Sequence, residues 1–553
     1  MNKSDKVYDI IVIGSGVGGL TFASLMAQLA RKRVLVLERH FKLGGYTHTF
    51  DRKGYRWDVG VHYVGQMAKD KECRHLFDLI TQGKVDWYKM PEKFDQFNYP
   101  DFSFPVDADP AIYKADLINR FPQESASLHQ YFEDVIRVQQ WFKDQIFQSM
   151  FPAPLRWAMR IAGGASRALA MQTTQTYLDK KFKSIELKAL LPSQWGDCGL
   201  PPRKSPFAMH ALIVGHYFGG GYYPLGSSKS IADAIAPIIK AAGGDCLVNH
   251  TVKNIIVEDG QAKGVTVIID RGKTKEEKTF MAPIVVSDAG HAITFGALVP
   301  AKYQVTLPPQ VCADICSAIT VYIGLKCNPQ ALGFKGENHW IFETYNHDLM
   351  FANTLATAGG KAGGCFLSFP SLKDPGAKKH TAEIIGFIKF DEFAKWSDTK
   401  WKHRGEDYEA FKQQMTQTLL DPVEKQFPGF SELIDYTELS TPLTVKGFTG
   451  HVEGAIYGYP STAQEFSKRT FDPKTSIKNL YMTGADVVSL GIMGAVMGGV
   501  VTASHMLGGL RGLNRIMQTA KELSNRLALE PLITLPSAES AKETCNKALV
   551  EKT

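Results

Sequence analysis

Hydrophobic and polar positions in the first forty residues follow a strand–turn–helix–strand order. The apolar run Ile10 to Ile13 meets a glycine-rich turn, and residues 19–30 then place small and apolar side chains at helical spacing. Residues 33–38 form a second, almost wholly apolar run, which is typical of a strand buried on both faces. The pattern predicts strands over residues 7–13 and 33–38 joined by a helix, a compact βαβ unit.

The same patterns predict further elements along the chain. The Asp259-Gly260 pair predicts a hairpin turn between two strands. Glycine-rich residues 215–226 are interpreted as a loop, and the polar residues beyond about 515 as one helix with a loose tail. The other predicted helices span residues 125–148 and 230–242, and the other predicted strands span residues 284–289 and 479–486.

The segment from Val487 to Leu510 contains no Asp, Glu, Lys or Arg. A run of that length could cross a bilayer. It is also crowded with glycine, and a helix buried in a large soluble core has the same composition. We interpret the segment as a buried helix rather than a membrane span.

Length and composition are those of an ordinary folded protein. The chain has 553 residues, 44% of them hydrophobic and 22% charged, which is enough for two or three domains with cores of their own. The net charge of +7 gives no argument for nucleic acid as a partner, although a local basic cluster could favour anionic lipid. The eight cysteines lack metal-type spacing, and no metal site is predicted.

A basic segment indicates contact with a membrane surface. From Gln145 to Leu178 there is no acidic residue, while Arg156, Arg160 and Arg167 recur among hydrophobic side chains. This pattern favours an amphipathic basic helix lying in an interface, and the alternative is a core helix with a few solvated arginines. The chain passes from charged residues directly into its first strand, without the apolar stretch of a signal peptide. We therefore expect peripheral association on the cytoplasmic side of a membrane.

The glycine turn carries the first candidate chemistry. Gly14 permits the tight turn, Gly16 lets a pyrophosphate approach the backbone, and Gly19 packs the helix against the strand, while the helix N-terminus supplies amide donors. Glu38 ends the second strand at the interval expected for an acid that accepts a hydrogen bond from a ribose hydroxyl. The turn, the helix and the acid together predict a dinucleotide site.

The residues that follow favour FAD over NAD. A second glycine pair, Gly44-Gly45, comes shortly after Glu38. A flavin extends beyond its pyrophosphate and needs backbone that can approach its ribityl chain, whereas a plain NAD domain has no need of this pair. The sequence contains no second strand–GxGxxG–helix unit, so we expect one cofactor, FAD, that stays bound, and an electron donor that remains unknown.

These motifs resemble the superfamily of FAD-dependent phytoene desaturases, carotenoid isomerases and retinol saturases, most of all its retinol saturase branch. The resemblance runs from residue 7 to about 510. DVGVHYVG at 58–65 and SFPSLKDP at 368–375 point to that branch more specifically than the generic FAD motifs do. LYMTGADVVSLGIMGAVMGGVVTA at 480–503 resembles the closing FAD motif, whose helix would direct its N-terminus at the flavin. This is why residues 487–510 are interpreted as buried.

The resemblance implies an α/β fold in which a Rossmann-type FAD-binding domain, like that of glutathione reductase, is interleaved with a mixed α+β substrate domain. The FAD-binding domain would comprise residues 1–75, 225–300 and 470–515. The other parts would be a substrate- or membrane-facing region at 76–224, a substrate domain at 301–469, and a C-terminal helix and tail at 516–553.

It also implies site residues. His62 and Tyr63 are candidate proton donors, because the family motif places that segment near the flavin ring, and Tyr457 is a weaker candidate. Aromatic residues over 141–177, 216–223 and 454–460 are expected to line a tunnel for a long lipid. The residues implied to bind FAD are Gly14, Gly16, Gly18, Gly19, Glu38, Arg39, Gly44, Gly45, Val252, Gly484, Asp486 and Gly494.

Several reactions stay open at this point. A reduced flavin can saturate a carbon–carbon double bond of a long apolar polyene such as retinol, the reverse reaction desaturates a carotenoid, and a proton or electron that is only lent gives cis–trans isomerisation. Two readings from other classes are a non-catalytic escort of prenylated proteins and an amine oxidase. We expect an FAD-dependent oxidoreductase that acts on carbon–carbon double bonds.

Overall fold

One part of the molecule is built on a five-stranded parallel sheet. The computed structural model describes residues 6–272, 274–352 and 363–527. The sheet has the order β10-β2-β1-β14-β20, which follows the chain outward from β1 in both directions. Its strands are β1 (Ile10–Ile13), β2 (Val34–Leu37), β10 (Asp245–Leu247), β14 (Val285–Ser287) and β20 (Leu480–Met482). The strands predicted at 7–13, 33–38, 284–289 and 479–486 are confirmed, each shorter than predicted because only its central residues pair.

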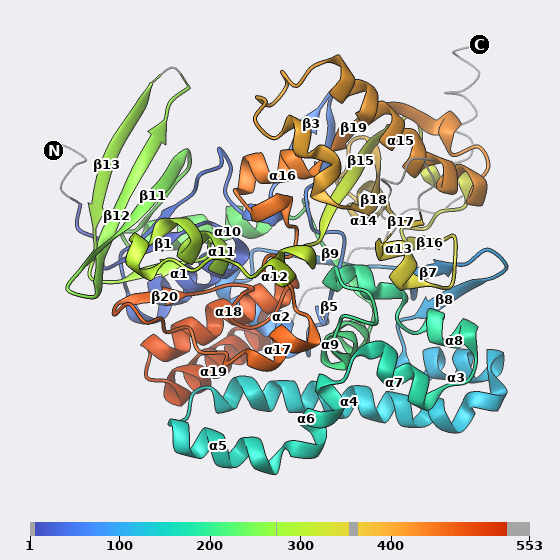
Figure 1. Cartoon of the computed structure of the whole chain (residues 1–553), viewed down its shortest axis with the longest axis horizontal. Helices are drawn as coiled ribbons and strands as arrows, with labels where there is room; N and C mark the ends of the chain where they lie inside the picture. Colours follow the sequence, from blue (N-terminus) through green and yellow to red (C-terminus); the bar gives the residue numbers. More distant parts are fainter. Residues whose placement is uncertain (1–5, 273, 353–362, 528–553) are drawn as a thin grey trace.

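The two faces of this sheet are covered by different elements. Ile10 and Val12 pack on helices that cover one face, whereas Ile11 and Ile13 lie on the other face, the side of a three-stranded antiparallel sheet. The helices are α1 (Val17–Ala30), α2 (Glu72–Thr81), α10 (Lys229–Ala241), α18 (Gly491–Met506) and α19 (Leu510–Leu527). The antiparallel strands are β11 (His250–Glu258), β12 (Gln261–Asp270) and β13 (Lys275–Met281), drawn at the upper left of Figure 1. The hairpin predicted at Asp259-Gly260 is therefore confirmed, as is the helix predicted at 230–242.

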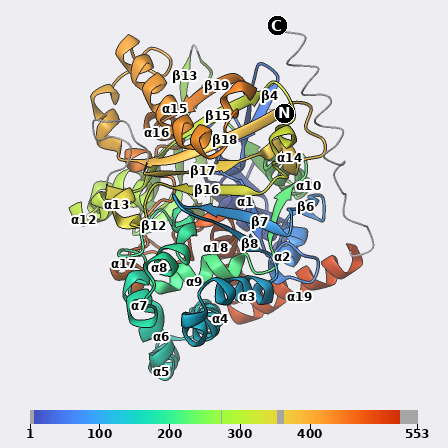
Figure 2. The same cartoon turned by 90° about the vertical axis from the view of Figure 1, so that its right-hand side faces the viewer.

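A seven-stranded mixed sheet forms the second part, in the order β19-β15-β18-β17-β16-β7-β8, and is seen as a stack of strands in Figure 2. Along β15, Ile319, Val321 and Ile323 pack towards α15 (Glu406–Gln426). The alternating residues Ala318, Thr320 and Tyr322 face the opposite way, into a cavity. The strands are β7 (Lys93–Asn98), β8 (Ser103–Asp107), β15 (Ser317–Leu325), β16 (Asn338–Phe342), β17 (Gly364–Ser368), β18 (His380–Ile388) and β19 (Ile434–Ser440).

Smaller elements connect these two sheets. Two short sheets pair β3 with β4 and β5 with β9 and β6. β9 lies within residues 215–226, so the prediction that this glycine-rich stretch is only a loop is wrong, since its tyrosines are buried and pair on both sides. These strands are β3 (Thr49–Arg52), β4 (Tyr55–Asp58), β5 (Val64–Gly65), β6 (Trp87–Lys89) and β9 (Gly221–Pro224). Short helices are α11 (His291–Ile293), α12 (Pro309–Ala313), α13 (His347–Ala352), α14 (Pro370–Lys373), α16 (Pro442–Thr449) and α17 (Ala463–Lys468).

A helical layer covers the lower part of the molecule in Figures 1 and 2. The helix predicted at 125–148 is confirmed as α4 (Ser125–Gln148). The basic segment at 145–178 is divided among several helices, because the chain breaks at Pro152, at Gly163 and before Thr173, and Arg156 and Arg160 lie on one of them and Arg167 on the next. The layer contains α3 (Pro110–Arg120), α5 (Ala153–Ala162), α6 (Gly164–Met171), α7 (Thr174–Lys181), α8 (Ile185–Leu190) and α9 (Phe207–His216).

Helix α18 is the element predicted to be buried at 487–510, and its glycines explain how it packs. A Cβ on Gly498 would lie 2.1 Å from the carbonyl oxygen of Gly484, and one on Gly499 would lie 2.7 Å from that of Gly18. The glycines therefore let α18 contact α1 and the end of β20 closely. Within the part of the chain that the structure describes, no helix is long and apolar enough to span a membrane. Of the predicted C-terminal helix and tail at 516–553, α19 covers the first residues and 528–553 lie outside the described part.

Candidate functional site

One cavity of about 770 Å³ lies between the carboxyl edge of the parallel sheet and the inner face of the seven-stranded sheet. At one end it is lined by backbone and polar groups of the glycine turn and the loops that follow the parallel strands. At the other end it is lined by large apolar side chains, among them Trp340, Phe366, Ile385 and Phe387. The two ends have different chemistry and are called the glycine end and the apolar end.

The glycine end lies where the strand order reverses. In an open parallel sheet the carboxyl ends of the strands form one edge, and dinucleotides bind at the crevice between strands that diverge from the first. Gly14 follows β1, Glu38 follows β2, Asp288 follows β14 and Thr483 follows β20, and all four line the cavity. The topology thus brings together residues that are up to 469 positions apart in the sequence.

The shape of the glycine end fits a pyrophosphate. Gly14 has φ +94°, which favours glycine, and Gly16 and Gly18 have no side chain that would fill the cradle. A Cβ on Gly16 would lie 2.4 Å from Oδ2 of Asp288. The hydroxyl of Thr483 is buried in the same wall without a hydrogen-bond partner in the protein, so it is available to a ligand. The N-terminus of α1 also faces this space and supplies the amide donors that anions bind.

Glu38 organises the turn as well as facing the cavity. Its Oε2 accepts hydrogen bonds from the Ser15 amide (2.9 Å) and hydroxyl (2.7 Å), and its Oε1 accepts one from the His40 amide (2.7 Å). A carboxylate has about four acceptor positions, so one remains for a ribose hydroxyl. The hydroxyl of Ser15 in turn accepts from the Gly44 amide (3.0 Å), which ties the second glycine pair to the first turn.

The other residues predicted to bind the cofactor fall into two groups. Asp486 lines the cavity and joins two loops, because its Oδ2 accepts from the His291 amide (2.6 Å) and its Oδ1 from the Tyr459 amide (3.3 Å). Arg39, Gly44, Gly45 and Val252 also line the cavity. Three predicted residues, Gly19, Gly484 and Gly494, are absent from its lining but would each clash through a Cβ with neighbouring backbone or with Asp288.

Asp288 was not predicted from the sequence. Its carboxyl group lies against Gly16, Gly18 and Gly484, and burial raises its pKa to about 8 despite a hydrogen bond from the Gly19 amide. An acid that stays protonated can lie beside a pyrophosphate without electrostatic repulsion. A strand followed by Ser-Asp-Ala-Gly at 287–290 is a weak sequence signal, since only the sheet order places it beside the first glycine turn.

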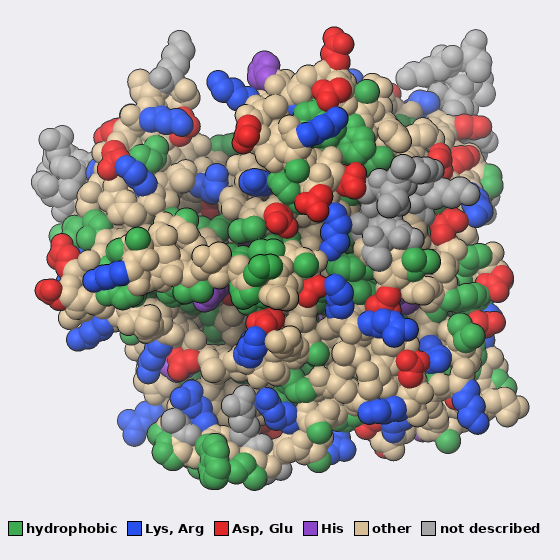
Figure 3. Space-filling model, in the orientation of Figure 1, with side chains coloured by type: hydrophobic (Ala, Val, Ile, Leu, Met, Phe, Trp, Pro, Cys, Tyr) green, Lys and Arg blue, Asp and Glu red, His purple; other side chains and the backbone are tan. Residues whose placement is uncertain are grey.

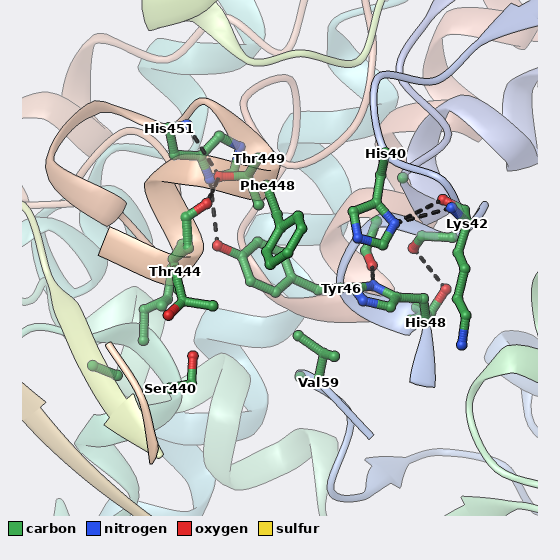
Figure 4. A pocket seen from close by; sticks show the side chains of 18 of the residues that line it. His40, Lys42, Tyr46, His48, Val59, Ser440, Thr444, Phe448, Thr449 and His451 are labelled. Atoms are coloured by element: carbon green, nitrogen blue, oxygen red, sulfur yellow. Dashed lines mark hydrogen bonds between the residues drawn. The ribbon is translucent and has the colours of Figure 1, made fainter. Parts of the chain in front are cut away.

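The middle of the cavity lies between the loop after β2 and helix α16 (Figure 4). The hydroxyl of Tyr46 donates a hydrogen bond to the Ala455 carbonyl oxygen (2.9 Å), and His451 Nδ1 lies 2.8 Å from the same oxygen. Burial lowers the pKa of His40 to about 4, so this ring is neutral near pH 7. The two walls come from the parallel-sheet part and the seven-stranded-sheet part, which Tyr46 links.

The predicted proton donors take different positions at the apolar end. His62 and Tyr457 line the cavity, whereas Tyr63 lies behind the wall, 7% exposed, and is absent from the lining. His62 Nδ1 lies 2.8 Å from Oε2 of the fully buried Glu383. The backbone carbonyl of His62 accepts a hydrogen bond from Lys373 Nζ (2.9 Å).

Lys373 belongs to the SFPSLKDP motif, and its contacts explain what the motif does in the structure. The side chain is fully buried, and its Nζ also donates to Ser368 Oγ (2.8 Å) and Asn338 Oδ1 (2.5 Å). Burial lowers its pKa to about 7, against the opposing charges of Glu383 and Asp95. The motif therefore holds the loop between β4 and β5, which carries His62, in place.

Two carboxyl groups near this wall, one half-buried and one fully buried, were not predicted from the sequence. Asp197 lines the cavity, and Asp95 lies behind it, fully buried. The hydroxyl of Tyr63 donates to Asp95 Oδ2 (3.0 Å) and lies 3.5 Å from Asp197 Oδ2. Each is a single acid in a mixed stretch, with no motif around it, and only the fold brings the two together.

The predicted aromatic tunnel is only partly in place. Of the aromatic stretches singled out, residues 454–460 contribute Ile456, Tyr457 and Gly458 to the cavity lining. The described aromatic residues of 141–177 and 216–223 are absent from its lining. Those on the helices are buried in the core or exposed, and Tyr222 and Tyr223 belong to β9. The apolar lining comes instead from the inner face of the seven-stranded sheet.

Comparisons with known proteins agree with this architecture. Residues 12–80 match the family model of an NAD(P)-binding Rossmann-like domain. The chain is 31% identical to all-trans-retinol 13,14-reductase of Danio rerio over 90% of its length and 86% of the relative. A protein of the same organism called inactive all-trans-retinol 13,14-reductase is 29% identical over 94% and 89%, and a chloroplastic prolycopene isomerase of Arabidopsis thaliana is 24% identical over 93% and 85%.

Solved structures support the fold. Cyclohexylamine oxidase of Brevibacterium oxydans has a TM-score of 0.55 at 16% identity, covering 95% of this chain and all of that one. The predicted fold class, a Rossmann-type cofactor domain with a mixed α/β substrate part, is confirmed. The chain is an oxidoreductase and its cofactor is FAD, whose pyrophosphate the shape of the glycine end would fit.

Proposed function

The chain belongs to the family of the all-trans-retinol 13,14-reductases, and from this premise we propose that it saturates one carbon–carbon double bond of a long apolar polyene of the retinol type. The observation that carries the proposal is the single cavity that joins a dinucleotide cradle to an apolar end. A polyene at the apolar end can reach the redox group held at the glycine end without leaving the protein.

The apolar end is suited to a molecule without charges. Trp340, Phe366 and Phe387 present their faces or edges to it from three adjacent strands. A further small cavity, about 30 Å³, shares these three side chains and Ile385, so apolar space continues behind them. A conjugated chain gains the burial free energy of its apolar surface here, about 25 cal/mol per Å².

The protein supplies orientation and a proton route. FAD in its reduced form supplies the hydride equivalent when bound. The polar side chains that line the cavity together with the apolar ones include His62, Asp197 and Tyr457. They are placed to give a proton to a polyene carbon, while the aromatic walls keep water away from the conjugated system.

A second reaction is favoured by one comparison. A prolycopene isomerase resembles the chain over 93% of its length, so we also consider cis–trans isomerisation of a polyene. The relative that is called inactive adds a third candidate, a protein that catalyses no reaction. This chain keeps the glycine cradle, Glu38 and Asp486 at the cavity, which supports a cofactor-dependent function.

The test is product analysis without oxygen. Purified holoprotein, its flavin reduced with dithionite, is incubated separately with all-trans-retinol, a coloured carotenoid and a polyunsaturated fatty acid, and products are measured by mass spectrometry. A gain of two hydrogens supports saturation, and an unchanged mass with a new retention time indicates isomerisation. Unchanged substrates with fully loaded enzyme would contradict both reactions, and loss of two hydrogens with oxidised flavin would reveal a desaturase.

We further propose that α5 binds the surface of an anionic bilayer from which the polyene is drawn. Leu155, Trp157 and Ile161 on this helix are 46%, 68% and 61% exposed. Figure 3 shows hydrophobic side chains gathered at the lower edge of the molecule, over α5. The segment 145–178 contains no acid that would repel lipid phosphates, and this supports attachment on the cytoplasmic side.

Vesicle pelleting tests this surface. The double variant Trp157→Ser/Ile161→Ser should lose most of its binding to vesicles of phosphatidylcholine and phosphatidylserine, because the inserted apolar area is gone. Ile185→Ser is the matched control, since Ile185 is 70% exposed on α8, away from α5. Equal pelleting of the double variant and the control would contradict membrane binding through α5.

A further inference from the structure

We propose that the side-chain carboxyl of Asp197 is the catalytic acid that protonates the polyene during reduction, with Asp95 as the positioning residue behind it. The inference rests on the proposed saturase function. It concerns a residue that the sequence motifs do not contain, and it assigns the proton to one of several polar groups on the wall of the apolar end.

Position is the first argument. Asp197 belongs to a short 3₁₀ helix, residues Ser193–Cys198, whose Gly196 and Asp197 face the cavity. A Cβ on Gly196 would lie 2.8 Å from the rings of both Trp340 and Phe387, so the backbone just before Asp197 packs directly against the apolar wall. A polyene lying against these rings passes next to Asp197.

The surroundings keep a proton on this carboxyl group. Asp95 is fully buried, and its two oxygens accept hydrogen bonds from Asn338 (3.0 Å), Gln194 (2.8 Å), Trp340 (3.3 Å) and Tyr63 (3.0 Å). Four donors stabilise a negative charge at Asp95, and that charge disfavours a second one at Asp197. Burial together with this charge raises the pKa of Asp197 to about 8, whereas that of Asp95 is raised to about 6.

The other polar groups on this wall are less suited to the task. Burial raises the pKa of Tyr457 and that of Tyr63 well above the ordinary value of 10, so both phenols are weak acids. Tyr63 also lies outside the cavity lining. His62 Nδ1 lies 2.8 Å from Oε2 of the fully buried Glu383. This contact orients the ring for binding, and Nδ1 is not placed to deliver a proton.

The step balances in atoms and charge. Saturation of one double bond adds a hydride to one carbon and a proton to its neighbour. The hydride, which carries both electrons, comes from the reduced flavin, which returns to its oxidised form. The O–H bond of Asp197 breaks, a C–H bond forms on the polyene, and the carboxylate that remains takes a proton from water after the product leaves.

The first test is Asp197→Asn, which keeps the shape of the side chain but has no acidic proton. Loss of a general acid lowers the rate of single-turnover reduction by about 10²- to 10⁴-fold. FAD content and flavin reoxidation by a one-electron dye should be unchanged, because the glycine end is untouched. Asp348→Asn is the matched control: burial raises the pKa of Asp348 too, but it lies outside the cavity lining.

The pH profile gives a second readout that a merely structural role would not change. The rate should fall as pH rises through the pKa of Asp197, about 8, because only the protonated form can donate. The titratable groups that face Asp197 are Asp95, Tyr63, Tyr217, Tyr457 and Cys198. Asp95→Asn removes the negative charge beside Asp197. The fall of the rate at alkaline pH should therefore move to lower pH.

Infrared spectroscopy of the holoprotein tests the proton itself, without turnover. The difference spectrum between wild type and Asp197→Asn at neutral pH should contain a protonated carboxyl band that shifts in D₂O, and its absence overturns the proposal even if Asp95→Asn fails to fold. Full saturase activity in Asp197→Asn would also overturn it. Failure of the wild type to reduce any polyene would instead overturn the proposed function, so the two failures are distinguishable.

Discussion

The two ends of the cavity are built in opposite ways. At the glycine end, four strands of one sheet deliver Gly14, Glu38, Asp288 and Thr483 to a common edge. At the apolar end, Asp197 comes from a 3₁₀ helix, Trp340 and Phe387 from different strands, and Tyr457 from a loop. The first site follows from sheet topology, whereas the second depends on packing between parts that share no local motif.

The electrostatics of the two ends differ in the same way. The glycine end offers backbone amides and a helix N-terminus, which attract anions. Behind the apolar end, Lys373, Glu383 and Asp95 are buried among hydrophobic side chains, and Asp197 lines the cavity itself, so the charges there depend on their partners. The glycine end thus depends mainly on backbone groups, whereas the apolar end depends on individual side chains.

The largest expected effect is at the apolar end. Lys373→Met removes a fully buried amine that donates hydrogen bonds to the His62 carbonyl, Asn338 and Ser368, and should lower the free energy of unfolding by about 3–5 kcal/mol. Denaturant unfolding measures the loss. Lys378→Met, an exposed position nearby, should change stability by no more than about 0.5 kcal/mol. Equal stability of the two variants would mean that the apolar end does not depend on its charge network.

A backbone test at the glycine end comes next. A Cβ on Gly18 would lie 2.4 Å from Cα of Gly484, so Gly18→Ala should push α1 away from β20 and cost about 1–3 kcal/mol. Gly164→Ala is the control, because no atom lies within 4 Å of its added Cβ. Thermal unfolding compares the two. A Gly18→Ala protein as stable as the control would contradict the close approach between α1 and the end of β20.

Glu38→Ala should weaken cofactor retention without unfolding the protein. The variant loses the ribose acceptor and leaves three donors of Ser15 and His40 without their partner, which should raise the Kd for FAD about 10- to 100-fold. Flavin absorbance after gel filtration measures this. Glu258→Ala, at an exposed position at the end of β11, should stay fully loaded. A fully yellow Glu38→Ala protein would rule out this contact.

The last expected effect is a change in pH dependence at Asp288. Its folded-state pKa, about 8, exceeds the ordinary value of 3.8, so the folded state binds the extra proton between these values. Stability should therefore fall as pH rises from about 4 to about 8, and Asp288→Asn should flatten that slope. Melting temperatures of the apoprotein at several pH values give the comparison. Parallel curves for the two proteins would show that Asp288 is ionised across the range.

The comparison of the two ends also explains what could be predicted from the sequence. The βαβ unit, the glycine turn and Glu38 were predictable, because a strand, a turn and a helix are contiguous and have characteristic spacing. Asp288 lies 250 residues beyond Glu38, and only the strand order brings it to the same edge. Sequence spacing contains no information of that kind.

The apolar end could not be predicted for a related reason. Along β15, Ile319 and Val321 lie on one face and Ala318 and Thr320 on the other. Both faces are apolar or nearly so, so the sequence does not say which face lines the cavity. The aromatic residues over 141–177 have the composition expected of the lining of a lipid tunnel. In the structure they pack in the helical layer or lie at its surface. Asp197 and Asp95 are 102 positions apart and acquire their relationship from tertiary packing alone.

The most direct test of the central claim asks whether the polyene and the flavin share one cavity. Oxidised holoprotein is titrated with all-trans-retinol while the flavin absorption spectrum is followed, in the wild type and in Ala318→Phe, whose added ring would fill the space at the inner face of β15. We predict a saturable spectral change in the wild type and its loss in Ala318→Phe with the FAD content unchanged. A wild-type flavin spectrum that retinol leaves unaltered, or an identical titration in both proteins, would contradict the account.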